Sequence, residues 1–200
     1  FPHMCTENLN KQFDKFPWQI NAGFLKAWQQ GKTGYPIVDA GMRELWETGY
    51  MHNRVRMIVA SFLVKNLLID WRIGLEWFNN CLCDSDLANN TASWQWTAGS
   101  GADAAPYFRI FNPQGQAEKF DEKRIYRNSY LNDGCGGSEQ ALSFFDAIPK
   151  SWNLSCKDAY PKPLIDLKVG RERALLAYKS LKSEDIYPNL MRFDLFSEFK

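Results

Sequence analysis

One stretch, residues 50–70, constrains the fold of this chain more than any other. Its apolar side chains surround most of the circumference of a helix instead of forming a single stripe. They are Val55, Met57, Ile58, Val59, Phe62, Leu63, Val64, Leu67, Leu68 and Ile69. A helix that is apolar on nearly every side must be buried by other elements. The run approaches the length of a membrane span, but charged residues interrupt it, so a central buried helix is predicted instead. These residues are Arg54, Arg56, Lys65 and Asp70.

An amphipathic helix is predicted between Pro36 and Gly49. Proline suits the first position of a helix, and glycine suits the residue that caps its end. The apolar face repeats at helical spacing and is expected to pack on the core. It consists of Ile37, Val38, Gly41, Met42, Leu45 and Trp46. On another face Asp39, Arg43 and Glu47 are spaced for i, i+4 ion pairs.

Further helices are expected at residues 22–30, 72–83 and 168–182. The inward side chains are predicted to be Ile73, Trp77, Phe78, Cys81 and Leu82 in the second, and Ala174, Leu175, Tyr178 and Leu181 in the third. Residues 1–21 read as an irregular entry, and residues 84–113 as polar and irregular with short helical turns at most. No segment alternates strongly enough to predict a sheet, and no internal repeat is visible. The predicted fold class is all-α.

Composition sets further limits. The chain has 200 residues, 45% of them hydrophobic, which suffices for one domain with a real core. Five cysteines without a paired CxxC motif or a secretory leader predict a reducing, intracellular compartment. With two histidines in the whole chain, Cys81-Leu82-Cys83 is not expected to bind a metal. Because the chain begins with Phe1, it reads as a fragment of something longer.

The net charge is +1, so any nucleic-acid binding has to come from a local basic patch. One candidate group consists of Lys119, Lys123, Arg124 and Arg127. A solvated helix face is the favoured interpretation of this group.

The run from Trp71 to Trp96 concentrates polar and aromatic side chains directly after the apolar helix. It contains Asp84-Ser85-Asp86, Asn89-Asn90 and Trp94-Gln95-Trp96. Acids and amides can hydrogen-bond a polar heteroaromatic ring, and tryptophans can pass electrons or stack on bases. Taken alone, a helix cap at Asp84 and a turn at Asn89-Asn90 are the favoured interpretation. Arg56 on the central helix needs a carboxylate partner, and Asp84 is the candidate.

Together with Met51-His52-Asn53-Arg54-Val55-Arg56-Met57 and Asp103-Ala104-Ala105-Pro106-Tyr107-Phe108-Arg109-Ile110-Phe111-Asn112-Pro113, this run resembles the flavin site of the DNA photolyase/cryptochrome family. The class I cyclobutane pyrimidine dimer photolyases are the most similar branch. The resemblance is dense from Trp18 to Phe120, whereas residues 128–160 do not map. It implies an N-terminally truncated helical FAD-binding domain, with residues 1–127 as its core and 128–200 as a divergent C-terminal part. The antenna domain, with a folate or deazaflavin chromophore, is expected to lie outside this sequence.

The resemblance implies that FAD is held by one set of residues. They are Asn53, Arg56, Asp84, Ser85, Asp86 and Asn90. Arg56 would pair with Asp84 beside the flavin ring, Asp86 would accept from the ring edge or ribityl chain, and Asn90 would face ring atom N5. Plant-type cryptochromes have an aspartate in place of Asn90. An amide supplies a proton less readily and goes with a fully reduced, electron-donating flavin, which favours repair over signalling.

The resemblance also implies roles toward electrons and DNA. Trp94, Trp71 and Trp18, in that order from the flavin to the surface, match the family's electron-transfer chain. The remaining matches concern damaged DNA: Trp96 as an aromatic wall, Met57 as an apolar contact and Asn53 beside the lesion, with Arg54 and Arg109 on the DNA backbone. Trp96 argues against plant cryptochromes and the single-strand-specific branch, which have tyrosine there, and Asn53 argues against the (6-4) branch, which has a second histidine.

The implied activity is light-driven repair of cyclobutane pyrimidine dimers, with damaged DNA as partner, no membrane and a monomeric protein. The compartment would be the cytoplasm in a bacterium and the nucleus or an organelle in a eukaryote. Because the turn that holds the flavin diphosphate lies outside this sequence, the isolated chain is expected to be an incomplete enzyme. A cryptochrome-like blue-light photoreceptor is the alternative, and a helical module that has lost its cofactor is a third interpretation.

Overall fold

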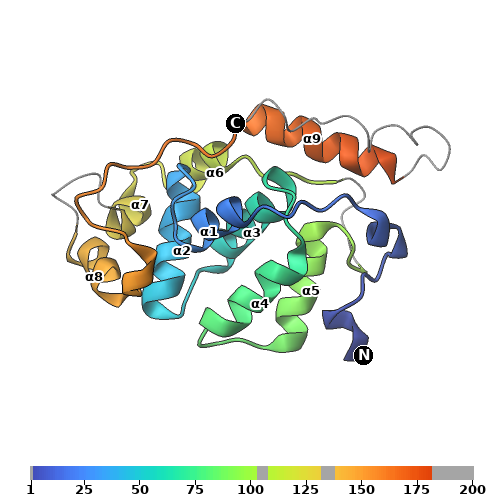
Figure 1. Cartoon of the computed structure of the whole chain (residues 1–200), viewed down its shortest axis with the longest axis horizontal. Coiled ribbons are helices and arrows are strands. Elements are labelled where there is room, and N and C mark those ends of the chain that lie inside the picture. Colours follow the sequence, from blue (N-terminus) through green and yellow to red (C-terminus); the bar gives the residue numbers. More distant parts are fainter. Residues whose placement is uncertain (1, 103–107, 132–137, 182–200) are drawn as a thin grey trace.

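The computed structural model describes residues 2–102, 108–131 and 138–181, and within these ranges it contains nine α-helices and no strand (Figure 1). The α-helices are α1 (Ala22–Gln29), α2 (Pro36–Thr48), α3 (Asn53–Ser61), α4 (Trp71–Cys81), α5 (Leu87–Ala98), α6 (Pro113–Phe120), α7 (Ile125–Tyr130), α8 (Glu139–Ala147) and α9 (Leu167–Ser180). Four short helical segments complete the described fold: η1 (Pro2–Cys5), η2 (Lys11–Lys15), η3 (Phe62–Asn66) and η4 (Lys150–Trp152). The all-α prediction is confirmed.

The central buried segment is present, but it is not one regular helix. Helix α3 passes into η3, a π-helical segment in which the Leu67 amide donates to the Phe62 carbonyl at 3.0 Å. The chain then leaves the helix through Leu68, whose φ is 55°. Phe62 and Leu67 are fully buried, as the all-round apolar pattern predicts. The wider helical turn was not visible in the sequence.

Helix α2 begins at Pro36 and is capped by Gly49 at φ 69°, as predicted. The i, i+4 ion pairs predicted for this helix do not describe the environment of Asp39, because Asp39 is completely buried. Its carboxylate accepts hydrogen bonds from the backbone amide and hydroxyl of Thr33, both at 2.7 Å, and from the Gly34 amide at 3.0 Å. Helix α2 contacts α3 on one side and α7 and α8 on another, so its polar face is enclosed too.

Helices α4 and α5 lie side by side and carry one wall of the fold (Figure 1). The face of α4 that packs inward is formed by Trp71, Gly74, Leu75 and Phe78. The prediction that Ile73 is buried is therefore wrong, since 37% of its surface is exposed. A helix that starts at Trp71 repeats its inward face at the third, fourth and seventh residues after it, and Ile73 falls outside that stripe.

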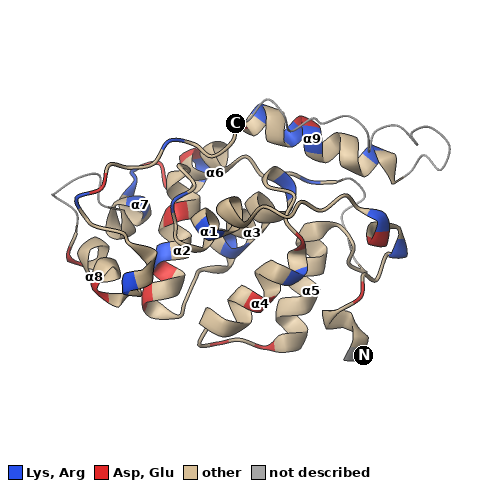
Figure 2. Ribbon diagram, in the orientation of Figure 1, with Lys and Arg blue, Asp and Glu red and all other residues tan. Residues whose placement is uncertain are grey.

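Helix α5 contradicts the prediction of an irregular segment after Asp84. Asp86 caps its start by accepting a hydrogen bond from the Asn89 amide at 2.8 Å, and Gly99 ends it at φ 95°. Asn89 and Asn90 therefore belong to the first turn of a helix. The helix carries no Lys, Arg, Asp or Glu (Figure 2), so the polar groups on its surface are amides, hydroxyls and indoles.

The C-terminal part of the described chain wraps back onto the N-terminal part. In α9, close to the predicted range, Ala174 is fully buried beside Phe13 and Phe16. Upstream of α9, the Leu164 amide donates to the Thr33 carbonyl at 2.9 Å. Ser138 caps the start of α8, and its hydroxyl accepts a hydrogen bond from the Ala141 amide. In the described part of the chain, no helix is both long and apolar enough to cross a membrane.

Candidate functional site

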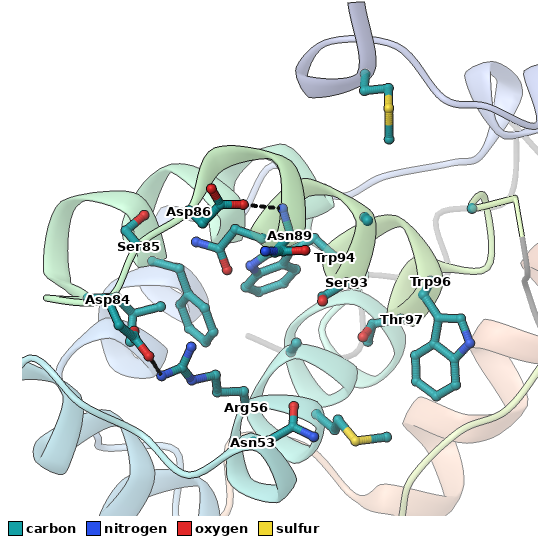
Figure 3. Close-up of a pocket in the computed structure, with 18 of the residues that line it drawn as sticks. Asn53, Arg56, Asp84, Ser85, Asp86, Asn89, Ser93, Trp94, Trp96 and Thr97 are labelled. Atoms are coloured by element: carbon teal, nitrogen blue, oxygen red, sulfur yellow. Dashed lines mark hydrogen bonds and ion pairs between the residues drawn. The ribbon is translucent and has the colours of Figure 1, made fainter. Parts of the chain in front are cut away.

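A cavity of about 720 Å³ lies among α3, α4, α5 and the loop between α4 and α5 (Figure 3). Pockets for small molecules and cofactors commonly measure about 300–1,000 Å³. Most of the predicted site residues line this one cavity. They are Asn53, Arg56, Met57, Asp84, Ser85, Asp86, Asn90, Trp94 and Trp96.

The predicted pair of Arg56 and Asp84 is present at the rim of the cavity. Arg56 Nη2 lies 3.0 and 2.9 Å from the two carboxylate oxygens of Asp84, and Arg56 Nε donates to the Met51 carbonyl at 2.6 Å. The guanidinium is thus held on two sides. Because half of the Asp84 side chain is exposed to solvent, the pair fixes geometry more than it adds stability.

Asp86 has a structural task in addition to the predicted ligand contact. One of its oxygens, Oδ1, receives the Asn89 amide as the N-terminal cap of α5. No hydrogen bond to the other oxygen, Oδ2, is present among the described residues, and Asp86 is one of the residues that line the cavity. The cap expected at Asp84 is therefore formed by Asp86.

Asn90 is held by a residue that the sequence did not single out. Its Nδ2 donates to Oδ1 of Asn79 on α4 at 2.8 Å. The Ser85 hydroxyl donates to the same oxygen at 3.0 Å. Asn79 itself is not among the residues that line the cavity, and no sequence motif marks it.

The cavity has two chemically different ends. In Figure 3, Arg56, Asp84 and Ser85 lie at one end and Trp96 at the other. Trp96 is half-buried, so part of its ring remains accessible, whereas Trp94 is buried with 2% of its surface exposed. An extended ligand with a polar and an aromatic part, or two ligands in contact, would match this arrangement.

The N-terminal segment forms part of the cavity wall through Met4 and Leu9. Buried Gln95 holds this segment in place: its Nε2 donates to the carbonyls of Met4 and Glu7, and its Oε1 accepts from the Leu9 amide at 3.0 Å. The sequence predicts an irregular entry for residues 1–21 and no role for Gln95. The sequence feature that could have indicated this role is the position of Gln95 between Trp94 and Trp96.

Two of the predicted electron-transfer tryptophans lie outside the cavity lining. Trp71 is fully buried, and its indole Nε1 donates to Asn8 Oδ1 at 2.9 Å. Trp18 is half-buried and packs on Phe16, with ring centroids 4.4 Å apart. Trp94 packs edge-on against Phe78 at 4.9 Å, which ties it to α4.

The two predicted phosphate-contacting arginines also lie outside the large cavity. The guanidinium of Arg54 lies 4.5 Å from the ring centroid of Phe120, and that of Arg109 lies 5.3 Å from Phe111. Such stacking restricts a side chain while leaving its charge available. Arg127 does not extend a basic surface, because it pairs with Asp121 at 2.9 Å and is largely buried.

A hollow of about 30 Å³ adjoins the other side of the Trp96 region, and Lys65 and Arg109 contribute to its lining. Burial lowers the pKa of Lys65 well below its usual range. Its Nζ lies 3.1 Å from the Phe108 ring centroid. Burial also raises the pKa of Glu44, a shift that hydrogen bonds from two tyrosines and the charges of His52 and Arg56 oppose.

In the described ranges, no group of three or more His, Cys, Asp or Glu side chains could hold a metal ion. The four cysteines within those ranges, Cys5, Cys81, Cys83 and Cys156, are free thiols. Burial raises the pKa of Cys81 to about 11, so its thiol stays protonated at neutral pH.

Fold and cavity together define a helical domain built to enclose a cofactor. The family model described as the FAD binding domain of DNA photolyase matches residues 1–180. The chain belongs to this family of photolyase FAD-binding domains. The family predicted from the sequence is thereby confirmed, and so is its FAD-binding character.

Relatives agree with this assignment. Deoxyribodipyrimidine photo-lyases are 49% identical over 193 residues in Agrobacterium fabrum and 48% identical over 176 residues in Escherichia coli. The chain spans 39% and 35% of the lengths of these two proteins, while 91% and 84% of the chain is covered.

Two solved structures are similar as well. A class III photolyase from Agrobacterium tumefaciens has a TM-score of 0.76 and 50% identity, covering 91% of this chain and 39% of its own. A cryptochrome from Synechocystis has a TM-score of 0.71 and 37% identity, covering 88% of this chain and 37% of its own. Photolyases and cryptochromes are thus both among the structural neighbours.

Proposed function

We propose that the intact protein repairs cyclobutane pyrimidine dimers in DNA by light-driven electron transfer from FAD, and that this chain supplies the cavity where cofactor and lesion meet. The observation that carries the proposal is that Asp84, Asp86 and Asn90 line the same cavity as Trp96. A cavity with the polar group alone would suit a flavin-binding protein of any activity. The accessible indole at the opposite end adds a surface on which bases can stack.

The residues present fit the flavin part of FAD. An isoalloxazine ring needs apolar walls and a few placed donors and acceptors along one edge. Phe78 and Trp94 supply walls, while Asp86 and Asn90 supply polar atoms at the cavity. When bound, reduced FAD would supply a light-excited electron for splitting of the cyclobutane ring and would take that electron back once the ring has opened.

The chain's own groups would hold the reactants in place. Arg56 neutralises Asp84 and keeps its carboxylate oriented at the rim of the cavity. Asp86 Oδ2 would accept a hydrogen bond from the ligand, while Oδ1 anchors α5. Asn53 and Met57 of α3 border the same space and would lie beside the lesion.

Access to the lesion requires that the dimer leave the duplex, and photolyases are themselves a standard example of base-flipping enzymes. Trp96 would stack on the extruded dimer. Arg54 and Arg109 would contact backbone phosphates, which gives position and salt-dependent affinity without sequence reading. Trp94, Trp71 and Trp18 would relay electrons that reduce the cofactor.

Within the family, Asn90 and Trp96 favour repair, and class I is the class that the sequence resemblance favours. Class III is the alternative class, because a class III photolyase is among the similar structures. A cryptochrome-like photoreceptor is the second candidate function, because a cryptochrome is among the similar structures. Asn90 argues against a photoreceptor, because plant-type cryptochromes have an aspartate in its place.

One experiment separates these functions. The intact protein is purified, reduced and mixed with an oligonucleotide that carries one cyclobutane thymine dimer, then exposed to blue light or kept dark. We expect intact thymines to be restored in the light alone. Bound reduced FAD without any restoration would favour the photoreceptor. A colourless protein that takes up no FAD would contradict the proposal at its first step.

A further inference from the structure

We propose that Asn79 is a positioning residue that orients the Asn90 amide, so that Asn90 presents its carbonyl oxygen, and not its NH₂ group, to the flavin. The inference rests on the proposed function, because the resemblance places Asn90 against ring atom N5. Asn79 lies on α4 and Asn90 on α5, so the contact joins the two helices that flank the cavity.

The contact is specific in its direction. Asn90 Nδ2 donates to Asn79 Oδ1 at 2.8 Å, and the Ser85 hydroxyl donates to the same oxygen at 3.0 Å. A carbonyl oxygen has two acceptor sites, and both are used here. In this arrangement Asn79 Oδ1 receives both donors, and the Asn90 NH₂ group points at α4.

An unrestrained asparagine could turn its amide by half a rotation and offer either group to a ligand. Asn79 Oδ1 accepts and cannot donate, so it selects the orientation in which the Asn90 NH₂ points toward α4. The Asn90 carbonyl is then the group left for the cavity, which Asn90 lines. The cavity presents an acceptor at this point.

An acceptor discriminates between the two redox states of a flavin. Ring atom N5 carries a hydrogen in the fully reduced state and a lone pair in the oxidised state. A fixed carbonyl oxygen can therefore bond to reduced N5 and is repelled by oxidised N5. Tighter binding of the reduced state raises the midpoint potential of bound FAD.

The expected size follows from one hydrogen bond. A net contribution of about 0.5–1.5 kcal/mol corresponds to an approximately 2- to 10-fold preference for reduced FAD. For a two-electron couple, tenfold corresponds to about 30 mV. Loss of the restraint on Asn90 should lower the potential by up to that amount.

The test is a spectroelectrochemical titration of FAD bound to the intact protein. Asn79→Ala removes the acceptor, and Asn79→Leu removes it while retaining bulk. Asn80→Ala is the matched control, because Asn80 is the exposed neighbour on the same helix. We expect both Asn79 variants to lower the two-electron midpoint potential by about 10–30 mV, and Asn80→Ala to leave it unchanged.

A second comparison separates positioning from general damage to the fold. In an Asn90→Leu background, Asn79→Ala should cause no further change in potential, because no amide remains to be oriented. Two results would overturn the role of Asn79 while leaving the proposed function intact. One is an equal drop in midpoint potential with and without the Asn90→Leu change, and the other is an unchanged potential in both Asn79 variants while FAD is bound. Failure of the unchanged protein to bind FAD would overturn the proposed function and this inference with it.

Discussion

At the residue scale, the tryptophans of the candidate site differ in how far they are exposed. This difference bears on the two roles that the resemblance implies for them, electron transfer and stacking on a base. Trp71 is enclosed and its indole N–H is bonded to Asn8. Trp96 keeps part of its ring accessible at the cavity. A rigid, enclosed ring suits electron relay, whereas an accessible ring suits stacking on a base. Their environments are therefore consistent with the two different roles proposed for Trp71 and Trp96.

Trp96→Ala is expected to weaken binding of dimer-containing DNA by about 1–3 kcal/mol, the usual value of one base–aromatic stack. FAD content should not change, because Trp96 lies at the end of the cavity away from Asp84 and Ser85 (Figure 3). Affinity is measured by fluorescence anisotropy with damaged and undamaged duplexes in the intact protein. Equal affinity of the variant and the unchanged protein for the damaged duplex would remove Trp96 from the lesion site.

Trp71→Phe is expected to slow photoreduction of oxidised FAD strongly, because phenylalanine is much harder to oxidise. Repair by protein that has been reduced chemically beforehand should continue at the normal rate. Absorbance changes under blue light give the first rate, and dimer reversal gives the second. Trp46→Phe is the control, since Trp46 packs with Trp77 and Trp152 away from the cavity lining. Normal photoreduction in Trp71→Phe would exclude it from the relay.

At the element scale, the contact between α4 and α5 decides the shape of the cavity. Gly74 lets the two helices approach, because a Cβ at this position would lie 2.2 Å from Cη2 of Trp94. Trp94 in turn packs on Phe78, one turn further along α4. The position of the tryptophan nearest the predicted flavin therefore depends on a glycine in the neighbouring helix.

Gly74→Ala is expected to destabilise the chain by about 1–3 kcal/mol through overpacking, even though alanine favours helices. Gly23→Ala is the matched control in α1, where the added Cβ would meet nothing closer than Asn21 Oδ1 at 3.4 Å. Free energies of unfolding from urea titrations give both values. A Gly74→Ala variant as stable as Gly23→Ala would mean that α4 and α5 adjust freely.

Helix α5 is an element that the sequence pattern did not predict. Its asparagines, serine and threonines are weak helix formers, so local propensity favoured a loop. The helix is instead established by the Asp86 cap, the Gly99 terminus and the packing of Trp94 on α4. These contacts join residues that are distant in the sequence or unremarkable in type. The buried central segment, by contrast, followed directly from its all-round apolar pattern.

At the scale of the whole molecule, the candidate site was largely predictable and its supports were not. The resemblance of motifs predicts that Asp84, Asp86, Asn90 and Trp96 share one cavity, and all four line it. Asn79 belongs to no recognisable motif. It holds Asn90, which lies 11 residues further along the sequence. Long-range polar contacts depend on the packed fold and leave no periodic trace in the chain.

The contact between α2 and the C-terminal segment of the domain could not be predicted from the sequence either. Tyr160 lies in a segment to which no motif could be assigned from the sequence, and its hydroxyl donates to buried Asp39 Oδ2 at 2.5 Å. Burial raises the pKa of Asp39, and the hydrogen bond from Tyr160 opposes that shift because it favours the charged form. Charge on Asp39 is thus tolerated with help from a residue more than a hundred positions away.

Tyr160→Phe is therefore expected to destabilise the domain by about 1–2 kcal/mol, and by more at higher pH. A raised carboxyl pKa makes the folded state bind more protons than the unfolded state, so stability falls as pH rises from the unfolded pKa through the folded one. Removing Tyr160 raises the folded pKa of Asp39 further and widens that window upward. Tyr50→Phe is the control, because its side chain is exposed.

Urea titrations of both variants and of the unchanged chain, at about pH 5 and about pH 8, provide the measurement. The loss caused by Tyr160→Phe should be larger at the higher pH, whereas Tyr50→Phe should change little at either. Equal losses at the two pH values would mean that Asp39 keeps one protonation state throughout. In that case the hydrogen bond from Tyr160 would contribute equally at both pH values, and the link between α2 and the C-terminal segment would not depend on the charge of Asp39.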